Sequence, residues 1–342
     1  ELDDGLFIPN GKLNDLRREA IYRLEEEITQ SYSRSERERQ FSSTFNGTEV
    51  AGEKNQAQNA PSIRVRLDDI RLLDTMLTYK VIEAIYLNCE EISFDQITTA
   101  SSKVRSAGKR FYLVLPHVFR KGVMEQFKGD LMNRMFSSID GIVIRNLEEY
   151  AFFKQYVIKY DLEVILDSNM YVINSEARAF WEEQGITRYT ASVELNSQEL
   201  NELNHKSADI IVYGHLTLMV SAQCVLNNTV GCIKNRKESI PSRNMYYELR
   251  DGKQKVFYVR NHCGFCYNTI YNGSPLYLFS HATDIKRLNP HSIRLDFTLE
   301  EVDEARKVMD TCIRSFSDQG YKQMESYQPS NMTKGHFNRG IE

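Results

Sequence analysis

The sequence predicts an α/β protein whose parallel strands and helices alternate and close into a (β/α)₈, TIM-like barrel. Eight short runs rich in β-branched and aromatic residues are separated by helix-length stretches of mixed polar and apolar residues. The first seven runs begin 21 to 31 residues apart, an interval typical of strand–helix units in a parallel sheet. The predicted strands are Ile63–Leu67, Ala84–Asn88, Arg110–Pro116, Gly141–Asn146, Glu163–Ser168, Arg188–Glu194, Asp209–Leu216 and Ser292–Phe297. Eight such units favour a closed barrel.

An open, doubly wound sheet is the alternative to the barrel. It would be expected to carry a glycine-rich phosphate loop after one of its strands, and the sequence contains none. The length of 342 residues suits one barrel with additions, or two domains.

The chain before the first strand divides into two parts. Residues 1–30 are predicted to be a helical segment that ends a preceding domain, because Leu13, Leu16, Leu24 and Ile28 recur at helical spacing. Residues 31–61 are polar and are predicted to be a linker. The barrel domain is then expected over residues 62–342.

An insertion interrupts the last strand–helix unit. The seventh and eighth predicted strands are separated by 75 residues, where about 25 would suffice, and we place the insertion at residues 221–287. Within it, Asp251-Gly252 lies between two β-rich runs, Tyr246–Leu249 and Val256–Val259, which predicts a hairpin. After the eighth strand, Leu299–Phe316 has the spacing of an amphipathic helix that closes the barrel.

Four of the six cysteines lie in this insertion: Cys224, Cys232, Cys263 and Cys266. The last two form a Cys-x-x-Cys pair, which places two thiols on one tight turn. Four such ligands suit tetrahedral zinc or an iron–sulfur cluster. The alternative is that they are small buried hydrophobic residues. We assign Cys89 and Cys312 to the core.

The insertion is also locally basic. Eight basic and three acidic residues lie between Lys234 and Arg260, interleaved with Tyr246, Tyr247 and Phe257. Basic groups for phosphate and aromatic faces for unstacked bases suit contact with structured RNA. A hairpin with one solvated face has the same composition and is the alternative.

The carboxyl ends of barrel strands meet at one mouth, where barrel enzymes bind their substrates. The sequence places Arg66, Arg145 and His215 there, together with Asn88, His117, Asn146, Asp167, Asn169, Glu194 and Tyr213. These cationic and polar groups predict a site for a carboxylate-bearing small molecule.

Charge and hydropathy narrow the class of protein. The net charge of −4 does not favour general attraction to nucleic acid or anionic membranes. Since no apolar run approaches the roughly 20 residues of a membrane helix and no leader opens the chain, we expect a cytoplasmic protein without a membrane partner. The chain begins with Glu1, so we expect a piece of a longer protein.

The segment from Val212 to Cys224, Val-Tyr-Gly-His-Leu-Thr-Leu-Met-Val-Ser-Ala-Gln-Cys, resembles the signature region of the peptidase U32 family. Supporting phrases lie at Leu115–His117, Val143–Glu149, Ser192–Asn196, Ile293–Thr298 and Gly335–Gly340. The likeness extends over Ile63 to Glu342. The opening Asp4–Pro9 is similar to the segment before a second barrel in long members, so the N-terminal part of the same longer protein is an expected partner.

The resemblance implies two kinds of activity. Some members are collagenase-like peptidases, whereas others take part in RNA hydroxylation, forming 5-hydroxyuridine in tRNA or 5-hydroxycytidine in rRNA. The latter are associated with an iron–sulfur cluster and with prephenate. By this resemblance Cys224, Cys232, Cys263 and Cys266 bind a 4Fe–4S cluster, with zinc as the alternative. Members often have Arg in place of His215 and Pro in place of Thr217.

We therefore expect a role in RNA base hydroxylation. One alternative is a peptidase, with Cys224 paired with His215 or His262. Another is a non-catalytic, metal-stapled barrel that supports an active N-terminal barrel. The sequence does not decide whether this barrel is itself an enzyme, and it names no catalytic residue.

Overall fold

The computed structural model describes residues 9–32, 60–203, 207–232, 246–316 and 327–340. The chain divides into two compact units, Glu1–Gln56 and Ala57–Glu342. The described part of the first unit is the helix α1, Asn10–Ser31, which includes the predicted apolar stripe. Most of the predicted linker, residues 33–59, lies outside the described residues.

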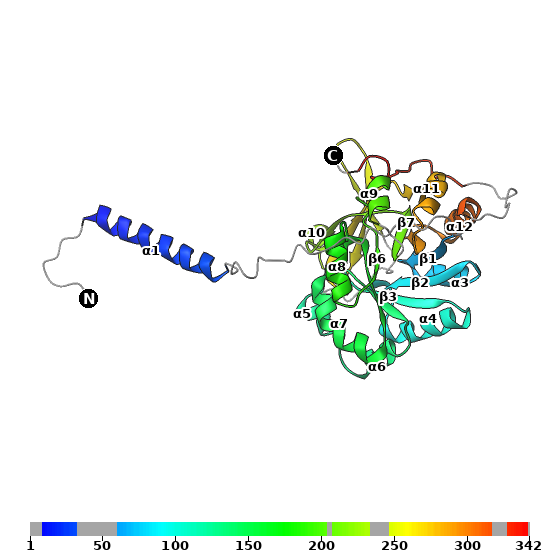
Figure 1. Ribbon diagram of the computed structural model, residues 1–342, viewed down its shortest axis with the longest axis horizontal. Coiled ribbons are helices and arrows are strands. Elements are labelled where there is room, and N and C mark those ends of the chain that lie inside the picture. The colour runs from blue at the N-terminus through cyan, green and yellow to red at the C-terminus, as the bar shows by residue number, and fades with distance from the viewer. Residues whose placement is uncertain (1–8, 33–59, 204–206, 233–245, 317–326, 341–342) are drawn as a thin grey trace. The chain divides into compact units, whose positions relative to one another are not determined.

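The second unit is a closed barrel of eight parallel strands, as predicted (Figure 1). Each strand pairs with its neighbours in parallel, and pairing of β6 with β7 closes the ring. Its strands, in order around the ring, are β1 Ser62–Leu67, β2 Ile82–Asn88, β3 Arg110–Val114, β4 Gly141–Ile144, β5 Glu163–Leu166, β6 Arg188–Thr190, β7 Ala208–Gly214 and β13 Ser292–Phe297.

Helices follow the strands and surround the barrel (Figure 1). The α-helices are α3 Leu73–Leu77, α4 Phe94–Ser106, α5 Lys121–Met124, α6 Asp130–Phe136, α7 Leu147–Tyr160, α8 Ser175–Glu183, α9 Ser197–Glu202, α10 Val225–Thr229, α11 Ala282–Arg287 and α12 Val302–Phe316. Short 3₁₀ helices are η1 Ile70–Leu72, η2 Cys89–Glu91, η3 Ser168–Met170 and η5 Phe279–His281. The predicted closing helix is α12.

The insertion between β7 and β13 folds as an antiparallel four-stranded sheet in the order β8-β11-β10-β9. Its strands are β8 Thr217–Ser221, β9 Tyr246–Arg250, β10 Val256–His262 and β11 Tyr267–Tyr271. The sheet therefore begins at Thr217, just before the expected insertion. A further short strand, β12 Leu276–Tyr277, returns the chain to the barrel by pairing antiparallel with β7.

The predicted hairpin forms between β9 and β10. Its turn is held by the Asp251 carboxylate, which accepts hydrogen bonds from the backbone N–H groups of Lys253 and Lys255 at 2.8 and 2.9 Å. Gln254 has the positive φ of 62° in this turn. The turn is therefore longer than a two-residue Asp-Gly turn.

The two sides of the barrel wall differ in composition. The outer side joins the helices in one large apolar core, whereas the apolar cluster inside contains only Ala84, Tyr86, Tyr112, Val114, Val143 and Ile165 among the described residues. Charged groups share the interior. Arg64 on β1 lies 3.9 Å from Asp209 on β7, and Arg294 on β13 donates to Thr190 on β6 at 2.8 Å. Because these strand pairs are not neighbours, such contacts cross the interior.

Gly214 ends β7 at the mouth of the barrel. Its φ is +142°, and a Cβ built there would lie 2.5 Å from the carbonyl oxygen of Asp296 and 2.8 Å from its Cβ. We expect Gly214→Ala to lower the free energy of unfolding by about 2 kcal/mol or more, because strain and overlap add. Urea denaturation measures this. Gly252→Ala is the control, since nothing lies within 4 Å of its added Cβ; equal stability of the two variants would contradict the prediction.

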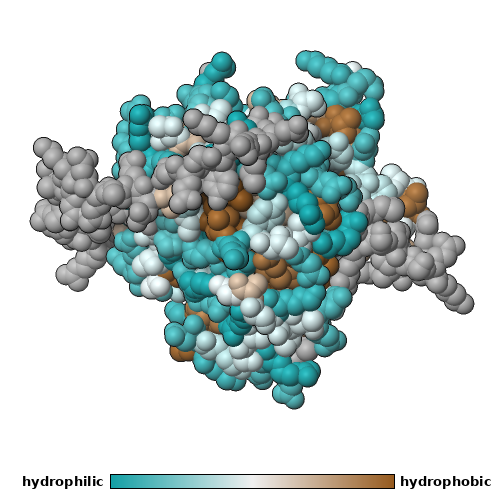
Figure 2. Space-filling view, turned by 90° about the vertical axis from the view of Figure 1, so that its right-hand side faces the viewer, coloured by the Kyte–Doolittle hydropathy of each residue, from teal (hydrophilic) through white to brown (hydrophobic). Residues whose placement is uncertain are grey.

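The surface of the face shown in Figure 2 is mainly hydrophilic, and its apolar residues form small separate patches. Within the described residues, no helix combines the length and apolar character needed to cross a bilayer.

Candidate functional site

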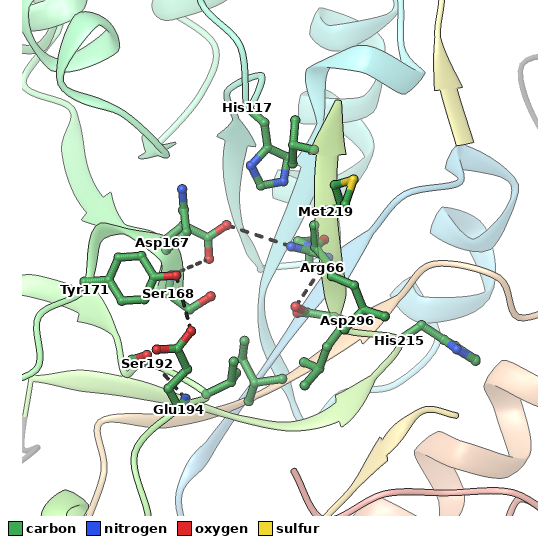
Figure 3. Close-up of a pocket in the computed structure, with 17 residues that line it drawn as sticks. Arg66, His117, Asp167, Ser168, Tyr171, Ser192, Glu194, His215, Met219 and Asp296 are labelled. Carbon is green, nitrogen blue, oxygen red and sulfur yellow. Dashed lines mark hydrogen bonds and ion pairs between the residues drawn. The ribbon is translucent and has the colours of Figure 1, made fainter. Parts of the chain in front are cut away.

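A cavity of about 250 Å³ opens at the carboxyl ends of the strands, and we call it the mouth cavity (Figure 3). Residues 216–220, in and before β8, cover one side of it. The polar side chains that matter for its chemistry are Arg66, His117, Asp167, Tyr171, Glu194 and Asp296. The cavity therefore offers one guanidinium group beside three carboxylates.

Arg66, a predicted binding residue, lines this cavity, and its guanidinium forms only long ion pairs with other described residues. Its guanidinium lies 3.6, 3.8 and 3.5 Å from the carboxylates of Asp68, Asp167 and Asp296. Figure 3 shows it between Asp167 and Asp296. Within the described residues, its buried Nε has no hydrogen-bond partner. These long ion pairs leave N–H donors for a ligand.

Arg145, the second predicted arginine, is placed differently. Its guanidinium donates to Asn88 at 3.0 Å, to Asp167 at 3.1 Å and to Glu90 at 3.4 Å. It is buried and does not line the mouth cavity. Its N–H groups therefore connect Asn88, Asp167 and Glu90 beneath the mouth cavity.

Asp167 joins these arginines. Its carboxylate accepts hydrogen bonds from Arg294 at 2.9 Å and from Arg145 at 3.1 Å, and Arg66 lies 3.8 Å away. Burial opposes ionisation, but the three guanidinium groups outweigh it and hold the pKa of Asp167 well below its usual range. Asp167 is thus ionised at neutral pH.

The two histidines of the mouth differ in orientation. Burial, aided by the charge of Arg145, holds the pKa of His117 well below its usual value, so this ring is neutral at pH 7. Figure 3 shows the His215 ring turned away from Arg66 and Asp167. Its Nδ1 lies 2.7 Å from the carbonyl oxygen of Asn272, at the end of the small sheet. His215 therefore links the barrel to the insertion.

All four cysteines of the insertion line a second cavity, of about 370 Å³, which we call the cysteine cavity. Cys224 precedes α10 and its Sγ accepts the Asn227 N–H at 3.4 Å, whereas Cys263 and Cys266 lie on the turn between β10 and β11. Burial and the nearby thiols of Cys263 and Cys224 raise the pKa of Tyr247. Within the described residues, no three His, Cys, Asp or Glu side chains converge closely enough to hold a metal ion. The four thiols therefore line one shared cavity.

Each cavity has a residue with an unusual backbone conformation. Tyr171 at the mouth cavity has φ of 51°, and Cys266 at the cysteine cavity has φ of 59°. Residues other than glycine adopt this left-handed region infrequently, and functional sites are one place where they do.

The sequence missed some of these residues. Asp296 lies near the end of the eighth strand, where the rule that found Arg66 applies equally, but it was not among the predicted mouth residues. Tyr171 lies on the loop after β5, and no periodic pattern marks it. Asn88, Arg145, Asn146 and Tyr213 were expected at the mouth but do not line its cavity.

Fold and site together define a (β/α)₈ barrel with a thiol-bearing insertion at the end where barrel enzymes bind substrates. The family model of Peptidase family U32 matches residues 86–341, and the chain belongs to this family. The predicted family is thereby confirmed.

Two curated relatives are both named tRNA hydroxylation protein P. The protein from Escherichia coli (strain K12) is 21% identical over 169 residues, which cover 48% of this chain and 37% of the relative. The protein from Haemophilus influenzae (strain ATCC 51907 / DSM 11121 / KW20 / Rd) is 22% identical over 144 residues, covering 41% and 31%. The match thus spans about a third of each relative.

Solved structures to which the chain shows similarity include a U32 peptidase, with a TM-score of 0.41 and 11% identity over 74% of this chain and 99% of that one. Thiamine phosphate pyrophosphorylase from Pyrococcus furiosus has a TM-score of 0.38 and 10% identity, covering 75% of this chain and 100% of that one.

Proposed function

We propose that this chain takes part in the hydroxylation of an RNA base, forming 5-hydroxyuridine or 5-hydroxycytidine. The base would enter the mouth cavity, and the cysteine cavity would hold an iron–sulfur cluster. The observation that carries the proposal is the gathering of all four cysteines around one cavity at the substrate end of a barrel. The names of the two relatives supply the substrate class.

The four thiols that line the cysteine cavity are ligands of the kind that an iron–sulfur cluster or tetrahedral zinc takes. A cluster has a volume of its own and takes four cysteine thiolates as ligands. In the proposal Cys224, Cys232, Cys263 and Cys266 hold it, and it supplies one-electron chemistry when bound. Zinc remains the alternative metal.

Contact with RNA would use the exposed part of the hairpin. Lys253 and Lys255 are exposed, and the Lys255 ammonium lies 5.2 Å from the centre of the Phe257 ring. Arg260 is unsuitable, because it is buried beneath Tyr246. Four of the eight basic residues, Lys234, Arg236, Lys237 and Arg243, lie outside the described residues.

The small carboxylate expected from the family resemblance, such as prephenate, would bind Arg66. The charge of the cavity limits what it can accept, because Asp167, Glu194 and Asp296 also line it. A ligand that combines a carboxylate with hydroxyl donors suits both kinds of group.

The structure gives the peptidase alternative less support. His215 lines the mouth cavity and Cys224 the cysteine cavity, so these two do not share one cavity. His262 does share the cavity of Cys224, but its Nε2 lies 3.0 Å from the Thr269 hydroxyl. For a supporting, non-catalytic barrel the test is whether the longer protein restores an activity that this chain lacks.

Metal and acid-labile sulfide content, measured on anaerobically purified protein, tests the proposal. We expect about four iron and four sulfide per chain with thiolate-to-iron absorbance, lost in a Cys263→Ser, Cys266→Ser variant and retained in Cys89→Ala, whose residue lies outside the cavity. Zinc alone, or no metal, would overturn the cluster. Nucleoside analysis of RNA incubated with the longer protein then tests base hydroxylation.

A further inference from the structure

The two cavities share a wall made of two rings. Tyr267 lines the cysteine cavity and His117 lines the mouth cavity. Their ring centres are 6.5 Å apart at an interplanar angle of 86°, and the His117 backbone N–H donates to the Tyr267 hydroxyl oxygen at 3.1 Å. Tyr267 directly follows Cys266 in the chain. Its position is therefore tied to that of the Cys-x-x-Cys turn.

A buried chain of polar contacts continues from Tyr267 to the mouth cavity. The Tyr267 hydroxyl donates to Oε1 of Glu90, and the same oxygen accepts from Arg145 at 3.4 Å. Arg145 donates to Asp167, which lies beside Arg66. The side chains of Glu90 and Arg145 are 1% and 2% exposed. Because water is excluded, a shift at one end has to be accommodated by the next group.

We propose that the Tyr267–Glu90 hydrogen bond couples the cysteine cavity to the mouth cavity. Metal bound by the thiols holds the turn at Cys266, Tyr267 then fixes Glu90 and Arg145, and Asp167 in turn positions the Arg66 guanidinium for a carboxylate. Tyr267 is a positioning residue, since it lines the cysteine cavity and acts on the mouth cavity through Glu90 and Arg145. By linkage, the carboxylate also stabilises the metal-loaded turn to the same extent.

This inference rests on the proposed function and predicts a measurable ratio of affinities. With prephenate as probe, isothermal calorimetry is expected to show at least about 5-fold tighter binding to the cluster-loaded protein than to the metal-free protein, the lower end of usual coupling. In Tyr267→Phe the ratio is expected to fall to about 1. Glu90→Gln, which keeps the shape but weakens the acceptor, is a second variant and should give the same result.

Tyr271→Phe is the matched control. Tyr271 lies on the same strand, is equally buried, and donates at 2.9 Å to Asp68, whose carboxylate lies 3.6 Å from Arg66, but it is further along the chain from the cysteines. This variant is expected to keep the ratio, whatever its absolute affinity.

The outcomes separate the inference from the function on which it rests. Equal affinities in the two forms of the unmodified protein, a preserved ratio in both Tyr267→Phe and Glu90→Gln, or no prephenate binding by either form would overturn the coupling and leave the cluster in place. An unmodified protein that loads no metal would overturn both. Melting temperatures of the variants identify any loss caused by unfolding alone.

Discussion

Replacement of Asp167 with alanine is expected to lower the free energy of unfolding by about 3–5 kcal/mol, the cost of removing one member of a buried ionic cluster. Arg294 and Arg145 would lose a hydrogen-bonded partner, and Arg66 would lose a nearby carboxylate. The three guanidinium groups would then remain in the barrel interior with one negative charge fewer. Chemical denaturation at pH 7 measures the loss.

The dependence of stability on pH distinguishes loss of the Asp167 charge from loss of side-chain volume at that position. The folded-state pKa of Asp167 lies well below its unfolded value, so the stabilisation is complete above about pH 3.9 and is lost as the pH falls through the folded pKa. The stability gap between the unmodified protein and Asp167→Asn should therefore stay constant above about pH 3.9 and narrow as the pH falls below that value. Asp161→Asn is the control, because Asp161 is exposed and asparagine tolerates its φ of 51°. A gap that does not depend on pH would contradict the prediction.

The barrel could be predicted because its signal is periodic. Each strand must present apolar residues to the surrounding helices, as Val65, Ile85 and Leu113 do in the outer core, and these residues recur with every strand–helix unit. Packing of β7 against β13 likewise requires a glycine at 214, but only the three-dimensional neighbours reveal why. The long interval between the seventh and eighth strands predicted the insertion, and Asp251-Gly252 between two β-rich runs predicted its hairpin.

The inside of the barrel was much less predictable. Arg64, Arg66 and Arg294 lie in sequence among β-branched residues, and their partners Asp209, Asp167 and Asp296 include residues on distant strands. No local pattern shows which arginine meets which carboxylate. For the same reason the sequence placed Arg66 and Arg145 in one class, although only Arg66 lines the cavity.

That difference leads to opposite expectations for two similar substitutions. Arg66→Met is expected to weaken binding of a small carboxylate by about 10- to 100-fold, the value of a charged hydrogen bond. It should lower the free energy of unfolding only slightly, because the neighbouring carboxylates retain other hydrogen-bond donors. Asp167 and Asp296 still accept from Arg294, and Asp68 still accepts from the Tyr271 hydroxyl. Calorimetry with prephenate measures the affinity.

Arg145→Met is expected to act on stability first. Its guanidinium donates to Asn88, Glu90 and Asp167, so its loss leaves Glu90 buried with the Tyr267 hydroxyl as its remaining described hydrogen-bond donor, and we expect a cost of about 3 kcal/mol or more. Denaturation curves of both variants, measured beside their prephenate affinities, separate the two roles. A stable Arg145→Met protein that has lost prephenate affinity, beside an Arg66→Met protein that keeps it, would reverse the assignment. The carboxylate would then bind beneath the floor of the mouth cavity, through the arginine that the geometry assigns to support.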